Sequence, residues 1–212
     1  GYTTSNLNQP SDLFVSGHRA YVTSKANNRL VVFDLSDPSA PDSLGSTGEG
    51  LANPVALHVS GPYAYVVSDG LAVFDVSDPT QIRLGAVTNA GMDAPTDVFV
   101  AGSRAYVTSA GNDSLVIYDV LDPRPGQIEL LGAAGGSMGA PQAVFVSGPY
   151  AYVVSDSDDL VIFDISDPDA IAIAGSTGAN LANPSDVFVA GNLAYVASSG
   201  NDRLAVFDVS DP

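Results

Sequence analysis

The sequence contains no cysteine and only two histidines among its 212 residues. Without cysteine the chain forms neither a disulfide framework nor a thiolate metal site. A packed all-β domain needs no disulfides, so secretion stays possible on this count. The two histidines, His18 and His58, stand in no spacing that is typical of a metal site or of a Ser-His-Asp triad.

Basic residues are scarce as well. Seven Lys and Arg face 24 Asp and Glu, which gives a formal net charge of −17. Because nucleic-acid binding depends on Lys and Arg that neutralise phosphates, we expect no nucleic-acid partner. The same charge disfavours anionic membrane surfaces. No apolar run approaches the ~20 residues of a membrane-spanning helix. No signal peptide is evident, and the start at Gly1 leads us to expect a processed product or part of a longer protein.

Five copies of one unit fill the chain. Each copy holds an apolar triplet, a glycine, Ala-Tyr-Val, a polar loop, and an apolar run that ends in Asp and then Asp-Pro. The copies are spaced by 44, 41, 46 and 43 residues, and they open at Pro10, Pro54, Pro95, Pro141 and Pro184. A period in the low forties with four short strands per unit is typical of β-propeller blades. We therefore predict an all-β fold over residues 1–212, a single five-bladed β-propeller with four antiparallel strands per blade.

Each unit predicts four strands, which we letter A to D from the innermost outward. Strand C is an apolar run such as Leu30–Phe33, and such a run is expected to be buried on both faces between neighbouring blades. The loops between strands B and C differ most among the copies. They are residues 24–29, 68–70, 109–114, 155–159 and 198–203. Variable loops on a rigid scaffold usually carry binding, so these are the expected binding surfaces.

Residues 1–9 match the end of a unit. Gly1 precedes Pro10 by nine residues, as the D-strand glycines of the first, third and fourth copies precede the next copy. We predict that residues 1–9 form the outer strand of blade 5, with Gly1–Ser5 beside Leu204–Phe207, and so close the ring within one chain. In the alternative, the strand pairs with blade 5 of a neighbouring subunit and builds an oligomer or filament.

The unit resembles a known repeat. The matching residues are Asp-Val-Phe-Val-Ala-Gly at 97–102, Ala-Tyr-Val at 105–107, and Leu-Val-Ile-Phe-Asp-Ile-Ser-Asp-Pro at 160–168. They resemble the LVIVD repeat, a propeller-forming unit of bacterial and archaeal surface or secreted proteins. The resemblance covers essentially the whole chain. It implies an extracellular or cell-surface location and a binding or structural role, with no known activity.

Three aspartates form the first candidate site. Asp12, Asp97 and Asp186 stand at the start of strand A in copies 1, 3 and 5, where copies 2 and 4 have alanine. Innermost strands line the central channel, so the three carboxylates could meet at its mouth and bind Ca²⁺, which prefers carboxylate oxygens. In the alternative, which we favour, no cofactor is bound and each Asp accepts hydrogen bonds from backbone amides of its own turn.

Two further acidic features are better explained by structure than by chemistry. The loop Asp156–Asp159 lacks the glycine and the glutamate of an EF-hand and is expected to be a solvated loop. The Asp-x-x-Asp-Pro motif could suggest the carboxylate pair of a glycosidase. Because it occurs in all five copies, we expect it to fix the turn between strands C and D. His58 replaces the phenylalanine of the other copies and is expected to be a core residue.

Three functions compete at this stage. The leading hypothesis is a non-enzymatic extracellular or cell-surface scaffold or adhesion-type protein, which binds a protein or a surface glycan and can assemble into oligomers or filaments. The second is a lectin-like propeller. Such lectins usually stack sugars on aromatic side chains, and this chain has no Trp and no aromatic residue in its B–C loops. The third is a glycoside hydrolase, which needs one unique carboxylate pair.

Overall fold

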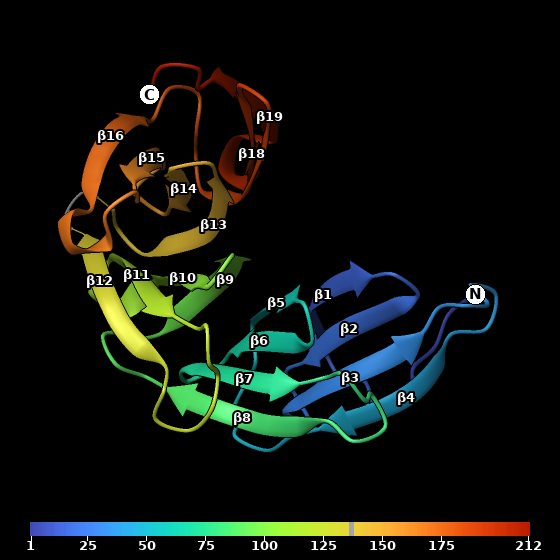
Figure 1. Cartoon of the computed structure of the whole chain (residues 1–212). Coiled ribbons are helices and arrows are strands. Elements are labelled where there is room, and N and C mark those ends of the chain that lie inside the picture. Colours follow the sequence, from blue (N-terminus) through green and yellow to red (C-terminus); the bar gives the residue numbers. More distant parts are fainter. Residues whose placement is uncertain (136–137) are drawn as a thin grey trace. The chain divides into compact units, whose positions relative to one another are not determined.

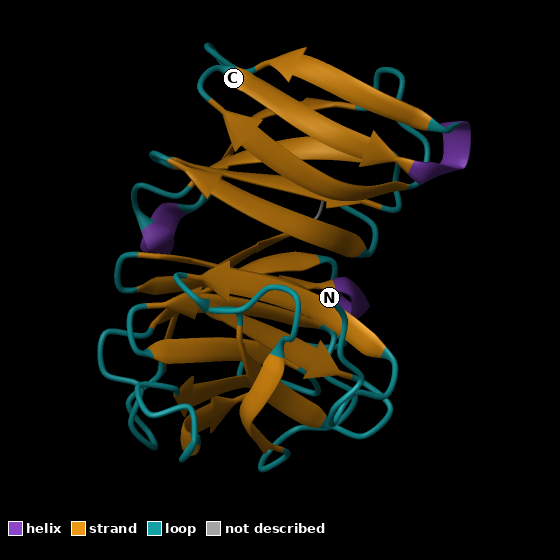
Figure 2. Cartoon of the chain, turned by 90° about the vertical axis from the view of Figure 1, so that its right-hand side faces the viewer, coloured by secondary structure: helices purple, strands orange, loops and turns teal. Residues whose placement is uncertain are grey.

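A computed structural model describes residues 1–135 and 138–212 (Figure 1). Nineteen strands form five antiparallel sheets, and three 3-10 turns are the only helical elements in these two ranges (Figure 2). More than half of the chain lies in strands, which confirms the all-β prediction. In the described part of the chain, no helix has the length and hydropathy required to cross a membrane.

Each repeat forms one sheet, and each sheet takes the number of its repeat. Strands that are consecutive in the chain pair as antiparallel hairpins. Sheet 1 contains β1 (Pro10–Ser16), β2 (Arg19–Ser24), β3 (Arg29–Asp34) and β4 (Asp42–Thr47). Sheet 2 contains β5 (Ala56–Ser60), β6 (Tyr63–Val67), β7 (Leu71–Asp75) and β8 (Arg83–Thr88).

The remaining sheets follow the same order. Sheet 3 contains β9 (Pro95–Ala101), β10 (Arg104–Ser109), β11 (Ser114–Asp119) and β12 (Glu129–Gly135). Sheet 4 contains β13 (Pro141–Ser147), β14 (Tyr150–Ser155), β15 (Asp159–Asp164) and β16 (Ala172–Thr177). Sheet 5 has three strands, β17 (Pro184–Ala190), β18 (Leu193–Ser198) and β19 (Arg203–Asp208). The 3-10 turns are η1 (Ala110–Asn112), η2 (Pro168–Ala170) and η3 (Ser199–Asn201).

The chain forms two compact units. The first holds residues 1–90 and 120–128, and thus sheets 1 and 2. The second holds residues 91–119 and 129–212, and thus sheets 3, 4 and 5. The single ring over residues 1–212 stays a prediction.

The first hairpin of every sheet is set by one glycine. Two residues separate the paired strands, and the first of them is a glycine with positive φ, for example +59° at Gly17 and +61° at Gly102. A two-residue loop with glycine in first place matches the right-handed twist of the flanking strands. The turn therefore fixes the register of the pair, as in Phe14 opposite Tyr21.

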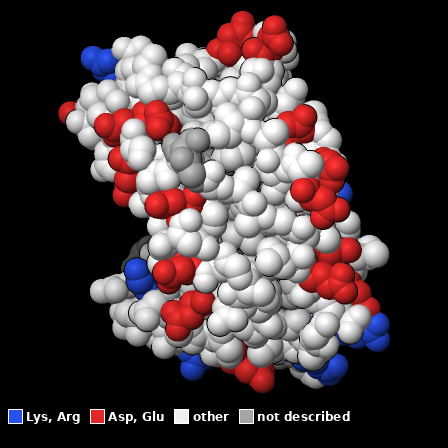
Figure 3. Space-filling view, turned by 90° about the vertical axis from the view of Figure 1, so that its left-hand side faces the viewer, with Lys and Arg blue, Asp and Glu red and all other residues white. Residues whose placement is uncertain are grey.

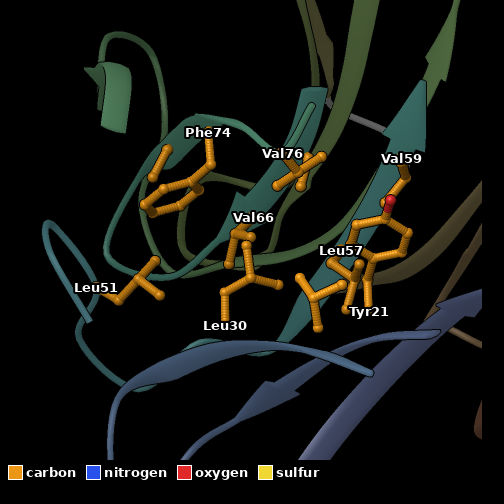
Figure 4. Packing of buried hydrophobic residues seen from close by; sticks show 11 residues of the cluster. Tyr21, Leu30, Leu51, Leu57, Val59, Val66, Phe74 and Val76 are labelled. Atoms are coloured by element: carbon orange, nitrogen blue, oxygen red, sulfur yellow. The ribbon is translucent and has the colours of Figure 1, made fainter. Parts of the chain in front are cut away.

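The third strand lies in the core in repeats 1 to 4, as predicted, whereas in repeat 5 the third strand, β19, is largely exposed. Leu30, Val32 and Phe74 of β3 and β7 are almost completely buried, and they pack in one cluster that joins sheets 1 and 2 (Figure 4). Equivalent clusters join sheets 3 and 4 and sheets 4 and 5. Burying one such side chain contributes about 1.5–3 kcal/mol, so these contacts between sheets dominate the stability of each unit.

A glycine in each outer strand lies against the Asp-Pro segment of the next repeat. At Gly45 of β4, an added Cβ would overlap the carbonyl oxygen of Pro79. The same contact occurs between Gly85 and Pro123 and between Gly132 and Pro168, and Gly175 lies beside Pro212. Because the backbone of the Asp-Pro segment cannot move aside for a Cβ atom, glycine is required where each D strand contacts this segment of the next repeat.

The N-terminal segment lies outside the five sheets. No strand is assigned within Gly1–Ser5, and sheet 5 has three strands, so the pairing of residues 1–5 with blade 5 stays a prediction. Gly1 nevertheless lies against the carbonyl oxygens of Pro38 and Ser39, beside sheet 1 (Figure 1). Gly1 therefore has the surroundings of an outer-strand glycine.

Candidate functional site

The carboxylates of the Asp-x-x-Asp-Pro motif stabilise the turn between strands C and D by local hydrogen bonds. Oδ1 of Asp34 accepts hydrogen bonds from the amide of Ser36 at 2.8 Å and from its hydroxyl at 2.6 Å. Asp37 accepts the same pair of hydrogen bonds from Ser39, at 2.9 and 2.6 Å. The pattern recurs at Asp75, Asp78, Asp164 and Asp208, and Asp167 accepts from the amide of Asp169. This confirms the prediction that the motif fixes the C–D turn.

These bonds favour the ionised carboxylate. They lower the pKa of Asp34, Asp37, Asp75 and Asp78, with the serine or threonine hydroxyl as the largest cause. In repeat 3 the partner changes, because Asp122 pairs with Arg124 and its pKa is lowered by that guanidinium. Acids of this kind stay charged at neutral pH and cannot serve as a general acid.

Aspartates of the first strands bridge neighbouring sheets. In β1, Oδ1 of Asp12 accepts from the amide of Leu13 at 2.7 Å, and Oδ2 accepts from the amide of Leu57 in β5 at 2.7 Å. In β9, Asp97 accepts from Val98 and from Val144 of β13, both at 2.8 Å. The predicted hydrogen bonds from an amide of the aspartate's own turn are thus present at Asp12 and Asp97. The second bond, to the next sheet, had not been predicted.

Two more bonds accompany each bridging aspartate. The hydroxyl of Ser11 donates to the carbonyl of Pro54 at 2.7 Å, and that of Thr96 donates to the carbonyl of Pro141 at 2.6 Å. From the B–C loops, Oδ1 of Asn28 accepts from the amide of Asn53 at 2.8 Å. Asp113 and Asp158 accept in the same way from Ala140 at 2.7 Å and from Asn183 at 2.6 Å.

The B–C loop aspartates and asparagines adopt left-handed backbone. φ is 56° at Asn28, 52° at Asp113, 64° at Asp158 and 55° at Asp202. Asn and Asp tolerate this conformation better than other side chains that carry a Cβ. Asp158 belongs to the acidic loop 156–159, where its Oδ1 accepts a hydrogen bond from the amide of Asn183. The signal in the sequence is an Asn or Asp directly before strand C in repeats 1, 3, 4 and 5.

Two apolar faces are open at the ends of the repeat array. On β1, Leu13 is 63% exposed and Val15 is 51% exposed, whereas the equivalent Leu57 and Val59 of β5 are buried. On sheet 5 the opposite face is open.

There, Phe188, Leu204 and Val206 are 56%, 69% and 50% exposed. The equivalents of Leu204 and Val206 in sheet 1, Leu30 and Val32, are fully buried. The face of sheet 5 is therefore open where the matching face of sheet 1 is buried.

The predicted calcium site stays a prediction. Asp12 belongs to the first unit, and Asp97 and Asp186 belong to the second. Among residues 1–135 and 138–212, no group of three His, Cys, Asp or Glu side chains could hold a metal ion. Oδ1 of Asp186 accepts from the amide of Val187 at 2.8 Å. Figure 3 shows the acidic side chains of one face in several separate groups.

His58 is a packing residue, as predicted. Its ring lies 4.8 Å from that of Phe14, centroid to centroid. Burial lowers the pKa of His58 to about 4, so the imidazole is neutral at pH 7. His18 lies in the turn between β1 and β2, where the sequence placed it.

The shortest B–C loop leaves a hollow on sheet 2. Residues 68–70 stand where other repeats have five or six residues. A hollow of about 350 Å³ lies here, lined by Leu51, Asp69, Val87 and Asn89 among others. The length of the B–C loop thus changes the shape of the surface at the end of the sheet that carries this loop.

The sequence model of the LVIVD repeat matches residues 9–47, 50–87, 138–177 and 183–212. The chain belongs to the LVIVD repeat family. Residues 95–135 lie outside the matched segments, yet they form sheet 3 with the same strand order as the matched repeats. A comparison with curated proteins found no match.

Solved structures share the fold at low identity. A functionally unknown protein from Desulfotomaculum acetoxidans is 12% identical, with a TM-score of 0.77 over 94% of this chain and 69% of that one. A protein from Lactobacillus plantarum is 15% identical, with a TM-score of 0.77 over 95% and 71%. A chain of the nidogen/laminin complex is 16% identical, with a TM-score of 0.69 over 95% and 76%. At these identities the likeness concerns the fold, which is propeller-like.

Proposed function

We propose that the chain is a non-enzymatic scaffold or adhesion-type protein of the cell surface or the extracellular space, folded as a closed five-bladed β-propeller. The observation that carries this proposal is that the repeated carboxylates accept hydrogen bonds that stabilise the fold. Asp34, Asp37 and their equivalents fasten turns, and Asp12 and Asp97 join sheets. The variation among repeats then lies mainly in the B–C loops, which is the pattern of a binding surface on a rigid frame.

Closure of the ring is supported by the two open faces and by Gly1. Leu204 and Val206 on sheet 5 and Leu13 and Val15 on β1 are complementary halves of the contact that buries their equivalents elsewhere. Gly1 lies against Pro38 as Gly45 lies against Pro79, which is the position of an outer strand from the preceding blade. In the closed ring, residues 1–5 pair with β19 and complete blade 5.

Closure within the chain is tested by removing residues 1–5. The truncated protein is expected to melt at a lower temperature and to aggregate through the edge of β19. Sedimentation of the full chain gives the control, because the sedimentation coefficient of a closed monomer does not rise with protein concentration. Concentration-dependent growth would instead mean that the strand pairs between copies, as in a head-to-tail filament.

The scaffold role is tested against the two other functions. The full chain is expected to bind no sugar on a glycan array and to release no product from a panel of chromogenic glycosides. An antibody to the chain is expected to label the cell surface in electron microscopy of native material. Saturable glycan binding would favour the lectin, turnover would favour the hydrolase, and purely cytoplasmic labelling would contradict a surface scaffold.

A further inference from the structure

In repeats 1, 3 and 5 the B–C loop is bonded to the turn that precedes the first strand of the same repeat. In repeat 1 the hydroxyl of Ser24 accepts from the amide of Asn8 at 2.7 Å and donates to its carbonyl at 3.0 Å. The side-chain amide of Asn27 donates to the carbonyl of Asn6 at 2.8 Å. The backbone amide of Ala26 donates to the carbonyl of Asn8 at 3.0 Å. The turn thus presents two carbonyl groups and one amide to the loop.

Repeats 3 and 5 form the same bonds at 2.8 to 3.0 Å, through the serine, the asparagine and a loop amide. The bonded pairs are Ser109 with Asp93, Asn112 with Gly91, Gly111 with Asp93, Ser198 with Ala182, Asn201 with Asn180, and Gly200 with Ala182. In all three repeats the carbonyl groups of the turn therefore receive a side-chain amide, a backbone amide and a serine hydroxyl.

Repeat 2 keeps this turn but has a shorter loop. φ is +67° at Gly50 and 59° at its equivalent Asn6, so the turn has the same left-handed backbone. The B–C loop of repeat 2 is three residues long and contains no asparagine, and the amide of Ser68 donates within it to the carbonyl of Gly70 at 2.9 Å. Within residues 1–135 and 138–212, the carbonyl groups of Gly50 and Ala52 accept no hydrogen bond.

The hollow of about 350 Å³ lies where the missing part of this loop would stand. Gly50 and Ala52 line it from the turn, and the exposed Asp69 lines it from the loop. Leu51 and Val87 give it an apolar side, and Val87 is 52% exposed. The hollow is thus rich in hydrogen-bond acceptors, carries a carboxylate and has an apolar wall.

An organic cation fits this hollow better than a metal ion or a sugar. Its volume is about ten times the ~30 Å³ of one water molecule, whereas Ca²⁺ needs six to eight oxygens that converge on one point. None of the described residues that line the hollow is aromatic, so a sugar ring has no stacking partner there. A guanidinium group has five N–H donors in one plane and a permanent charge, and its alkyl stem packs on apolar side chains.

We propose that this hollow on sheet 2 binds an arginine side chain of a partner protein. The inference rests on the proposed role as a binding scaffold and names the chemistry of the partner. The guanidinium donates to the carbonyl groups of Gly50 and Ala52, as the loop amides do in repeat 1, and pairs with Asp69, while its methylene groups pack on Val87. The net charge of −17 favours a cationic partner. All lining residues belong to the first compact unit, so the site does not depend on closure of the ring.

The test is an NMR titration of the full chain with a tripeptide Gly-Arg-Gly that has blocked ends. The amide signals of Ala52 and Gly70 are expected to shift and to saturate. Those of Asp93 and Gly111 are expected to stay in place, because their turn is filled by its own loop. The same peptide with norleucine in place of arginine has no side-chain donor and is expected to shift neither set.

The matched variants are Asp69→Asn and Asp156→Asn. Each removes one exposed carboxylate from the residue that follows the serine of a B–C loop. Asp69→Asn is expected to weaken binding of the arginine peptide about two- to fivefold at low salt, as for an exposed ion pair, and Asp156→Asn is expected to leave it unchanged. Replacement of residues 69–70 by the sequence of residues 110–114 rebuilds a six-residue loop and is expected to abolish binding.

The outcomes separate this site from the scaffold role. Equal shifts with the two peptides, or equal effects of Asp69→Asn and Asp156→Asn, would refute the arginine site. Shifts of the same amides with calcium chloride alone, and none with the peptide, would assign the hollow to a metal ion and also refute it. If the peptide fails to bind while the antibody labels the cell surface, the scaffold role stands and the site fails. If the peptide binds and labelling is purely cytoplasmic, the site stands and the surface scaffold fails.

Discussion

Leu204 offers a direct energetic measure of closure. In the present structure its side chain is 69% exposed, whereas Leu160, at the same position of sheet 4, is fully buried. Leu→Ala at a buried site costs about 2–5 kcal/mol, and at an exposed site without special contacts it costs within about 0.5 kcal/mol. If the face of sheet 5 packs on β1, Leu204→Ala must behave as Leu160→Ala does.

The assay is thermal and urea unfolding of both variants beside wild type. In a domain of this size, about 1 kcal/mol corresponds to about 2–4 °C in Tm, so a closed ring predicts a loss of at least about 4 °C for Leu204→Ala. Leu160→Ala is the matched control, and it must be destabilising in either case. A neutral Leu204→Ala beside a costly Leu160→Ala would show that the face stays open and that the reasoning about closure is wrong.

Three further predictions concern the repeat itself. Gly85→Ala is expected to lower Tm, because the added Cβ would meet the carbonyl oxygen of Pro123, whereas Gly→Ala at an unstrained and unhindered position usually raises stability; an unchanged or raised Tm would contradict the close approach. Asp78→Asn is expected to reduce the loss of stability that wild type shows in acid. The pKa of Asp78 is lower in the folded than in the unfolded state, so the charged carboxylate stabilises the fold above its unfolded-state pKa, and this stabilisation is lost as pH falls through its folded-state pKa. Identical acid-unfolding curves for the variant and wild type would rule this out. His58→Phe is expected to remove a loss of stability between about pH 6.5 and 4, because His58 binds a proton more readily when unfolded; an unchanged pH profile of urea unfolding would refute it.

Local pattern and period predicted most of the fold. The glycine turns, the buried C strands and the turn-fixing Asp-x-x-Asp-Pro motif depend on neighbours within one repeat, so they could be inferred from residues such as Gly17, Leu30 and Asp34. The bridging bonds were missed because they join residues about 25–47 positions apart, as in Asn28 to Asn53 and Asp97 to Val144. In the sequence these bonds are signalled only by the residue at the start of the first strand, which is Asp in repeats 1, 3 and 5 and Ala in repeats 2 and 4. From the sequence alone, the same pattern also suggests a metal site. The N-terminal strand was predicted from register alone, and a strand needs its partner before it has any hydrogen bonds to define it.

The most direct test of closure joins the N-terminal segment to β19 covalently. Gly1 stands at the position of Gly132, so Thr4 corresponds to Gly135, which is opposite Ser114 in sheet 3. Thr4 is therefore expected opposite Arg203, within the reach of a disulfide. The chain has no cysteine of its own, so Thr4→Cys with Arg203→Cys gives a clean readout, with Thr4→Cys and Asp159→Cys as control. We predict that mild oxidation of the dilute protein crosslinks the first pair within the monomer and leaves the control pair open. Failure of the first pair to form this bond, or crosslinking only between molecules, would contradict a ring closed within the chain.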